Sequence, residues 1–204
     1  MLKSAFTLLE LVFVIVVVGI ISIVLIPNFN KNNSGEAAYQ IAEHLRLAQH
    51  LAMAEDFTGQ SATWQARLWR MRFTNSPQGF CYTVFANRDE NRNADRIESA
   101  IDPLTKLRVY SDAGCNQNQA DTPDALLWRR FGVRAVNLNG CGRNAHIAFD
   151  NLGRAGQVQG TIFIPLINNC IINITTDNDE NATVVVVPET GYVDVIQING
   201  ITLP

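Results

Sequence analysis

A long apolar run near the N-terminus constrains this chain more than any other feature of its sequence. Residues 6–26 are almost all Leu, Ile, Val and Phe. The exceptions are Thr7, Glu10, Gly19 and Ser22. A helix of this length extends about 30 Å, the thickness of the hydrocarbon core of a bilayer. The run is longer than the apolar part of a secretory signal, and no small-x-small cleavage site follows it. It therefore predicts a membrane span rather than a buried core helix.

The composition of the whole chain hides the difference between this apolar run and the rest of the sequence. The 204 residues are 47% hydrophobic and 17% charged, with a net charge of -3. These values exclude a disordered polymer, a collagen-like repeat and a polytopic membrane protein. The negative charge also argues against a nucleic-acid binder that works by bulk charge. Because one segment holds much of the hydrophobicity, the remainder is more polar than the average and is typical of an acidic domain.

Glu10 is the anomaly within the apolar run. A carboxylate one turn into a lipid span costs about 2.5 kcal/mol or more, unless it is paired or faces protein. No basic residue lies in the run, since Lys3 precedes Glu10 by seven residues and Lys31 lies beyond the far end. The alternative is an acid that reaches the membrane surface. Glu10 is thus a candidate functional residue.

The residues around Glu10 carry a family resemblance. The stretch Lys3-Ser4-Ala5-Phe6-Thr7-Leu8-Leu9-Glu10-Leu11 resembles the class III signal of type IV prepilins and pseudopilins, with Ala5 where most members have Gly. The resemblance implies that a prepilin peptidase removes the leader, residues 1–5, by cutting between Ala5 and Phe6. It also implies methylation of the new amine of Phe6. In this family the acid at the position of Glu10 meets the N-terminal amine of a neighbouring subunit during assembly.

A second helix is expected after the apolar run. Pro27 predicts a bend or a stop, and Asn33 with Glu36 is typical of a capping box that restarts a helix. Apolar residues then recur at helical spacing to about residue 56. The resemblance implies one long helix, with a transmembrane and assembly half at 6–27 and an amphipathic half at 28–56. Gly19 and Pro27 are the expected points of bending.

The helical period disappears beyond residue 56, and short alternating strands follow. They are expected at 64–73, 80–85, 107–110, 126–131, 145–149, 161–164, 170–175, 183–187 and 192–198. The resulting fold class is α+β, pilin-like, with the long N-terminal helix packed on an antiparallel β-sheet head at 57–204. The polar insert at 112–124 matches no segment that we can assign in the family that the chain resembles.

Three stretches of the head resemble the H-type (FimT/GspH-like) minor pseudopilins of type II secretion and pilus systems. The first runs from Val84-Phe85-Ala86-Asn87-Arg88-Asp89 to Glu98. The others are Ala148-Phe149-Asp150-Asn151-Leu152-Gly153-Arg154 and Glu189-Thr190-Gly191-Tyr192-Val193. Together they cover about a fifth of the head.

The four cysteines all lie in the expected exported part. They are Cys81, Cys115, Cys141 and Cys170. An even count in an oxidising compartment favours at least one disulfide, and three connectivities are possible. Their spacings do not match a zinc site, and no C-x-x-C is present.

One loop resembles a calcium site in part. Oxygen-bearing side chains alternate at Asp89, Asn91, Asn93 and Asp95. The central Gly of such a loop is replaced by Ala94, and the twelfth position is Ala100 instead of Glu. A solvated turn is therefore the preferred interpretation, with calcium as the alternative. No other cofactor or metal is expected.

Arginines and tryptophans are interleaved in two stretches. They are Trp64, Arg67, Trp69, Arg70 and Arg72, and then Trp128-Arg129-Arg130. Such a mixture can bind DNA through phosphate contacts and stacking. The exposed face of a strand is preferred here because the chain is acidic overall. The three histidines are scattered, no nucleophile motif is present, and we expect no enzymatic activity.

The resemblance implies a minor pseudopilin or prepilin-like structural subunit of a bacterial type II secretion, type IV pilus or competence system. Its expected place is the inner membrane, single-pass, with a cytoplasmic N-terminus and a periplasmic head. Its expected partners are other pilins or pseudopilins, prepilin peptidase and the assembly platform. The alternative is a membrane-anchored periplasmic binding domain with an uncleaved signal anchor.

Overall fold

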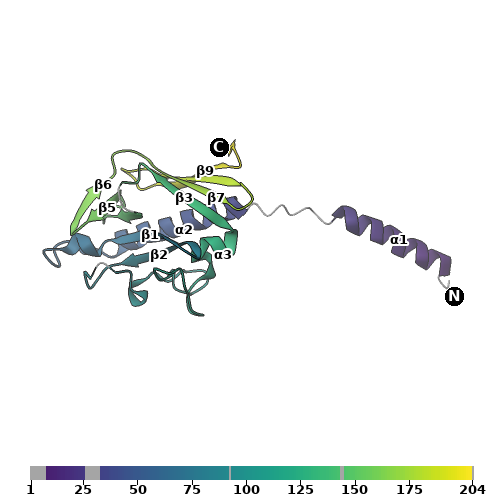
Figure 1. Ribbon diagram of the computed structural model, residues 1–204, viewed down its shortest axis with the longest axis horizontal. Helices are drawn as coiled ribbons and strands as arrows, with labels where there is room; N and C mark the ends of the chain where they lie inside the picture. The colour runs from purple at the N-terminus through teal and green to yellow at the C-terminus, as the bar shows by residue number, and fades with distance from the viewer. Residues whose placement is uncertain (1–7, 26–32, 92, 143–144, 204) are drawn as a thin grey trace, which may run out of the picture. The chain divides into compact units, whose positions relative to one another are not determined.

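The computed structural model describes residues 8–25, 33–91, 93–142 and 145–203. Its contacts divide the chain into two units, Met1–Lys31 and Asn32–Pro204. In the described part, the first unit is a single helix, α1 (Leu8–Leu25). The second unit, called the head below, holds α2 (Asn33–Ala54), the short α3 (Leu127–Phe131) and all the strands (Figure 1).

Two five-stranded antiparallel sheets form the head. The first has the order β2-β1-β4-β5-β6. Its strands are β1 (Trp69–Ser76), β2 (Gly79–Ala86), β4 (His146–Phe149), β5 (Ala155–Gln159) and β6 (Ile162–Pro165). The β1–β2 hairpin pairs Trp69 with Ala86 at its open end and Ser76 with Gly79 at its turn.

The second sheet has the order β10-β9-β8-β7-β3. Its strands are β3 (Val133–Asn139), β7 (Cys170–Thr176), β8 (Asn181–Val186), β9 (Val193–Ile198) and β10 (Ile201–Thr202). β7, β8 and β9 form the antiparallel meander expected from the sequence. Along β7 buried and half-buried residues alternate, as expected for a strand with one face on the core.

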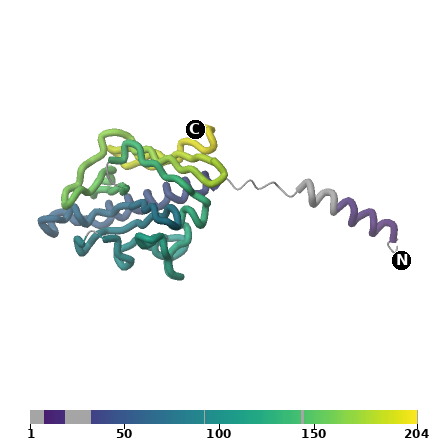
Figure 2. The backbone as a smooth tube through the Cα atoms, viewed as in Figure 1, coloured from purple at the N-terminus to yellow at the C-terminus, as the bar shows by residue number. Residues whose placement is uncertain are grey.

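The helix α2 is buried against both sheets, and Figure 2 shows its backbone running between them. Six of its apolar side chains have no exposed surface. They are Ala37, Ala38, Ile41, Ala42, Leu45 and Ala48. These positions form two neighbouring stripes, so the helix has apolar surface to cover on more than one side. Four of the six are alanines, which lets the strands pack close to the helix backbone.

The expected fold class, one long N-terminal helix packed on an antiparallel head, is wrong. Within the residues that the structure describes, the chain is mainly two antiparallel sheets, and the helices span 18, 22 and 5 residues. α2 packs in the core with the strands, because its small side chains fit between two sheets, and Leu127 and Phe131 of α3 join the same core. Within the described residues, no helix is both long and apolar enough to cross a membrane.

Some strand predictions were also wrong. The stretch 126–131 forms α3, which ends at Gly132 in a left-handed conformation with φ 67°. The stretch 107–110 forms only isolated bridges, and 64–67 is a 3-10 turn before β1. β3 and β5 were missed. Their sequences, Val-Arg-Ala-Val-Asn-Leu-Asn and Ala-Gly-Gln-Val-Gln, contain few large apolar residues, and pairing with β7 and β4 supplies the strand geometry.

His44 places a titratable ring in the core. It lies on α2, is 3% exposed, and its Nδ1 is 2.6 Å from the hydroxyl oxygen of Tyr82. Burial lowers the pKa of His44 from 6.5 to about 4, against weaker opposing effects of Asp102, Asp124 and Glu43. The folded head therefore keeps this ring neutral through the mildly acidic range.

We expect the free energy of unfolding to fall as the pH is lowered from 6.5. Below this value the unfolded chain binds a proton at His44 that the folded chain binds only near pH 4. The slope is up to about 1.4 kcal/mol per pH unit for one such histidine. His44→Gln should reduce the slope measured by urea unfolding between pH 6.5 and 5. The control is His50→Gln, at an exposed residue of the same helix. An unchanged slope in His44→Gln would contradict the assignment.

Candidate functional site

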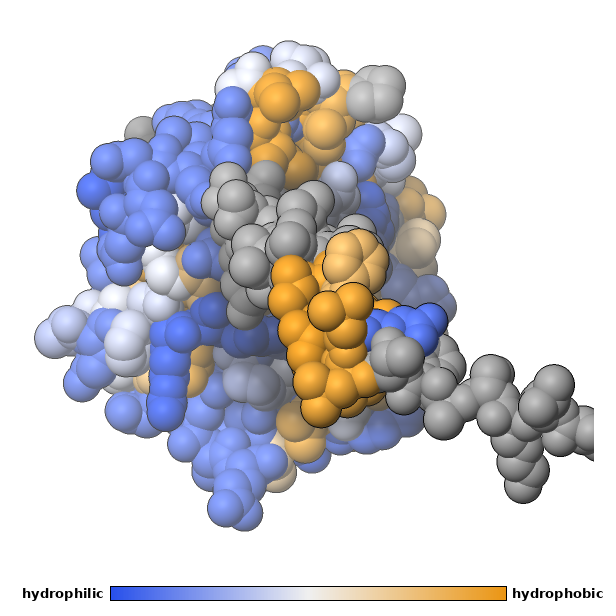
Figure 3. All heavy atoms as spheres, turned by 90° about the vertical axis from the view of Figure 1, so that its right-hand side faces the viewer, coloured by the Kyte–Doolittle hydropathy of each residue, from blue (hydrophilic) through white to orange (hydrophobic). Residues whose placement is uncertain are grey.

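The helix α1 exposes an apolar surface along its described side chains. Leu8 and Leu9 are 82% and 81% exposed, and Phe13 is 69% exposed. Figure 3 shows hydrophobic side chains gathered on this helix, while the visible surface of the head is mostly hydrophilic. Leaving a large apolar side chain in water instead of burying it costs about 1.5–3 kcal/mol. This surface therefore requires an apolar environment or a partner.

Glu10 lies in the first turn of α1 and is exposed. It lines a shallow groove with Leu9, Val12, Phe13 and Val16. Since Phe13 and Val16 follow Glu10 at intervals of three residues, the carboxylate shares one side of the helix with apolar groups. An acid in such a row can bind a cation on a neighbouring apolar helix.

Of the other N-terminal residues implied by the resemblance, only Gly19 lies within the described residues. Ala5 and Phe6, the expected cleavage pair, lie outside the described residues, as does Pro27. Gly19 lies inside α1, which is one helix from Leu8 to Leu25.

Two disulfides join the four cysteines of the head. Cys81 of β2 is bonded to Cys115 in the insert, and Cys141 is bonded to Cys170 at the start of β7. The second bond belongs to the main core, whereas the first forms a small separate cluster with Leu126. The sequence alone left the pairing open, because it depends on which strands become neighbours.

In the loop that resembles a calcium site, Glu98 lies beside two of the residues expected from the sequence. Asp89, Asp95 and Glu98 each place one carboxylate oxygen within 4.8 Å of the others. The Asn91 side-chain amide donates to Asp89 at 2.6 Å and to Asp95 at 2.9 Å, so it already bridges the two aspartates. Asn93 instead donates its backbone N–H to Asn91 at 2.6 Å.

Glu98 was missed in this loop because its spacing does not match a calcium motif. It is 5% exposed, and its Oε1 accepts the backbone N–H of Asp89 at 3.0 Å. Burial raises the pKa of Glu98, and the nearby Asp89 and Asp95 act in the same direction. The loop is thus a hydrogen-bonded acidic turn that brings Glu98 to the two aspartates.

Two of the three stretches that resemble H-type pseudopilins meet on α2. The side-chain amide of Gln49 donates to the carbonyl oxygen of Gly153 at 2.9 Å and to that of Thr190 at 2.8 Å. A Cβ on Gly191, whose φ is 59°, would lie 1.9 Å from the Gly153 oxygen, so only glycine fits there. Arg46 adds a bond to the Val193 carbonyl at 2.8 Å. These stretches therefore join the two sheets through α2.

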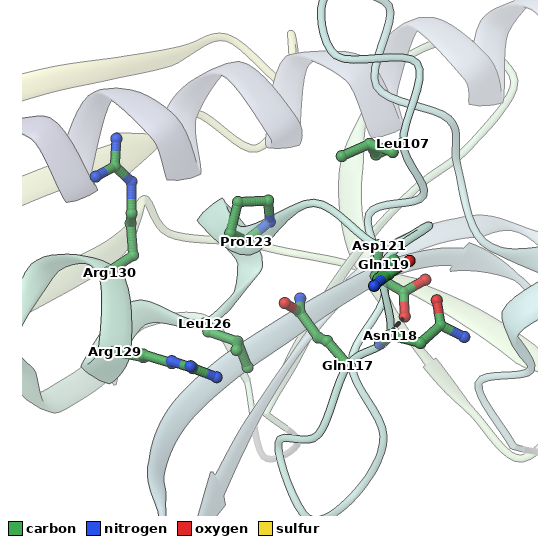
Figure 4. Close-up of a pocket in the computed structure, with 9 residues that line it drawn as sticks. All are labelled: Leu107, Gln117, Asn118, Gln119, Asp121, Pro123, Leu126, Arg129 and Arg130. Atoms are coloured by element: carbon green, nitrogen blue, oxygen red, sulfur yellow. Dashed lines mark hydrogen bonds between the residues drawn. The ribbon is translucent and has the colours of Figure 1, made fainter.

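A polar depression of about 650 Å³ lies between the insert and α3. Figure 4 shows Arg129 and Arg130 on one side and the amide side chains of Gln117, Asn118 and Gln119 on the other. Gln117 is fixed by bonds from its amide to two backbone carbonyls, those of Tyr110 at 2.8 Å and Thr122 at 2.7 Å. The depression is open and mixed in character, with Leu107, Pro123 and Leu126 beside its amides and guanidinium groups, and these polar groups suit a polar ligand or another protein surface.

The first arginine and tryptophan stretch is not an exposed strand face. Trp69 is buried in the core and donates from its ring N–H to Glu55 at 2.8 Å. Arg70 is buried and Arg72 is half-buried. Arg67 forms an ion pair with Glu90 at 2.8 Å. The expectation of an exposed face was wrong because Arg70 and Arg72 line a small cavity together with residues of β2, β4 and β5.

No family model, curated protein or solved structure matches the chain.

We expect the two disulfides to differ in their contribution to stability. Their sequence separations are 34 and 29 residues, and loops of this size give each bond about 3–4 kcal/mol through the unfolded state. Replacing Cys141 and Cys170 by Ser should cost more than replacing Cys81 and Cys115, because it also puts two hydroxyls in the main core. Urea unfolding of the two double variants measures the loss in the free energy of unfolding for each disulfide. The same two pairs of cysteines replaced by Ala are the controls. Equal losses in the two Ser variants would contradict the expectation.

Proposed function

We propose that the protein is a minor, prepilin-like structural subunit of a bacterial type II secretion or type IV pilus and competence machine. Prepilin peptidase cleaves it between Ala5 and Phe6 and methylates Phe6. The N-terminal segment holds it in the inner membrane and then assembles with neighbouring subunits into a periplasmic filament. The head contacts other minor subunits or the cargo of the machine.

The exposed apolar surface of α1, with Glu10 in its first turn, carries this proposal. Neighbouring helices of the same kind would cover that surface, and the methylated amine of another subunit would meet Glu10. In a low dielectric an unpaired carboxylate and an unpaired ammonium each carry a large desolvation cost, so their pairing fixes the register of two helices. The two disulfides support an exported head.

The second candidate is a membrane-anchored periplasmic binding domain with an uncleaved anchor. The polar depression beside α3 favours it, since the depression could hold a polar ligand. Under that function the N-terminus stays intact and Glu10 has no role in assembly.

We propose no resident cofactor for the filament role, and calcium at the acidic turn is the alternative. Because Asn91 already bridges Asp89 and Asp95, adding calcium to the EDTA-treated chain should leave its melting temperature unchanged within about 1 °C. A rise of several degrees that disappears in Glu98→Gln would instead identify calcium binding at the turn. Glu43→Gln, at an exposed acid of α2, is the control.

Glu10→Ala should abolish co-assembly while membrane insertion stays intact. The variant removes the only acid of the apolar segment and leaves no group to pair with the neighbouring amine. Crosslinking to neighbouring subunits in cells, with membrane fractionation, measures the two effects separately. Glu10→Gln keeps the shape without the charge and should also fail, whereas Glu43→Gln should crosslink normally. Normal crosslinking of Glu10→Ala would reject the assembly role.

Blocking cleavage should stop assembly. Ala5→Glu places a long charged side chain where the family has a small residue, and we expect it to leave the full-length chain in the membrane. Mass spectrometry of the native wild-type protein should find N-methyl Phe6 at its start. An intact Met1 in a functional protein would instead support the anchored binding domain.

A further inference from the structure

A small cavity on the side of the first sheet that faces away from α2 is lined by two arginines. Its volume is about 150 Å³, and it is lined by Arg70, Arg72, Phe85, Asn87, His146, Val158 and Gly160. Arg70 and Arg72 alternate with the core residues Trp69, Met71 and Phe73, so both point to this outer side of β1. His146 and Phe85 come from the two flanking strands, opposite Arg72 and Arg70 respectively.

The two guanidinium groups line the same cavity and contact the same ring without an ion-paired acid. Each guanidinium carbon is 5.3 Å from the centre of the Phe85 ring. In the described part of the chain, neither arginine forms an ion pair with a carboxylate. Glu98 acts on Arg70 only at longer range. Two cations that share a buried site repel each other, and each has lost part of its hydration.

Arg70 is held rigidly in this position. It is 8% exposed, its Nε donates to the Leu68 carbonyl at 3.1 Å, and a terminal nitrogen donates to the Ala66 carbonyl. Burial, and then the charge of Arg72, lower the pKa of Arg70 to about 10, so it remains protonated at neutral pH. Neutral carbonyls anchor the side chain but leave its charge uncompensated.

His146 adds a neutral donor to the same cavity. Its Nε2 accepts the backbone N–H of Val158 at 3.1 Å. Burial, and then the two arginines, lower the pKa of His146 to about 4. The ring is therefore neutral at pH 7, and since Nε2 is an acceptor, Nδ1 carries the proton.

We propose that this cavity is a binding site for one small tetrahedral dianion of the phosphate or sulfate type. Such an ion neutralises both guanidinium groups at once and accepts hydrogen bonds from the planar donor set of Arg72 and from the N–H groups of Arg70 that do not bind the Leu68 and Ala66 carbonyls. The volume of about 150 Å³ is too small to admit a nucleic-acid duplex. The inference is independent of the proposed filament role, because it rests on the head alone.

Isothermal titration of the full chain in mild detergent, at pH 7.5 and constant ionic strength, tests the site with inorganic phosphate, sulfate and acetate. We expect saturable one-to-one binding of phosphate and sulfate, and binding of acetate weaker by about tenfold or more because it has one charge. Arg72→Gln should weaken phosphate binding by about tenfold or more. Arg129→Gln is the matched control, since it removes the same charge from the polar depression, and it should bind phosphate as the wild type does.

Thermal unfolding separates a binding site from a purely structural pair of arginines. Without added anion, Arg72→Gln should melt at the same temperature as the wild type or higher, since the variant relieves repulsion between two cations. With phosphate the wild type should gain stability and Arg72→Gln should not.

If the Arg72→Gln variant does not fold, Arg72→Lys, which keeps the charge but loses the planar donor set, should weaken binding several-fold. The absence of saturable phosphate binding to the wild type, or equal binding in Arg72→Gln or Arg72→Lys, would overturn the proposal. Loss of binding in Arg129→Gln alone would overturn it as well.

Discussion

The burial of α2 between two sheets is the interaction on which the head depends. Helix and strands share one continuous core, and the helix faces that core mainly with alanine, so the strands can approach its backbone. Polar groups along the same helix then fix its position. Gln49 binds the carbonyls of two distant turns, and His44 meets Tyr82 of β2. Every one of these contacts joins residues far apart in sequence, so the sheets and the helix stabilise each other only when all are in place.

How well the sequence predicts an element depends on how local its cause is. α2, which ends at Ala54, was predicted to end near residue 56 because its apolar spacing lies within the helix itself. The meander of β7, β8 and β9 was predicted from strong alternation and polar turns. β3 and β5 were missed, since their strand geometry comes from neighbouring strands. The long continuous helix was wrong because it was carried over from a resemblance to the N-terminal motif, which contains no information on how the head packs.

The same distinction applies to the candidate sites. The signature around Glu10 is contiguous, so it could be found by reading the chain, and it remains the basis of the filament proposal. Glu98 was missed because the turn at 89–95 had to fold before it came near Asp89. The cavity at Arg70 and Arg72 was hidden for another reason. Alternation along β1 indicated which side the arginines share, but only the fold shows that residues of β2, β4 and β5 form a cavity with them.

The placement of the two disulfides has a mechanical consequence. They close loops between residues 81 and 115 and between residues 141 and 170, so α2 lies outside both covalent loops. A pulling force applied through the N-terminal end of α2 would load the hydrogen bonds of Ser34, Arg46 and Gln49 and the alanine packing, but no S–S bond. Under tension α2 is therefore held to the strands by noncovalent contacts alone, whereas residues 81 and 115 and residues 141 and 170 stay joined by S–S bonds.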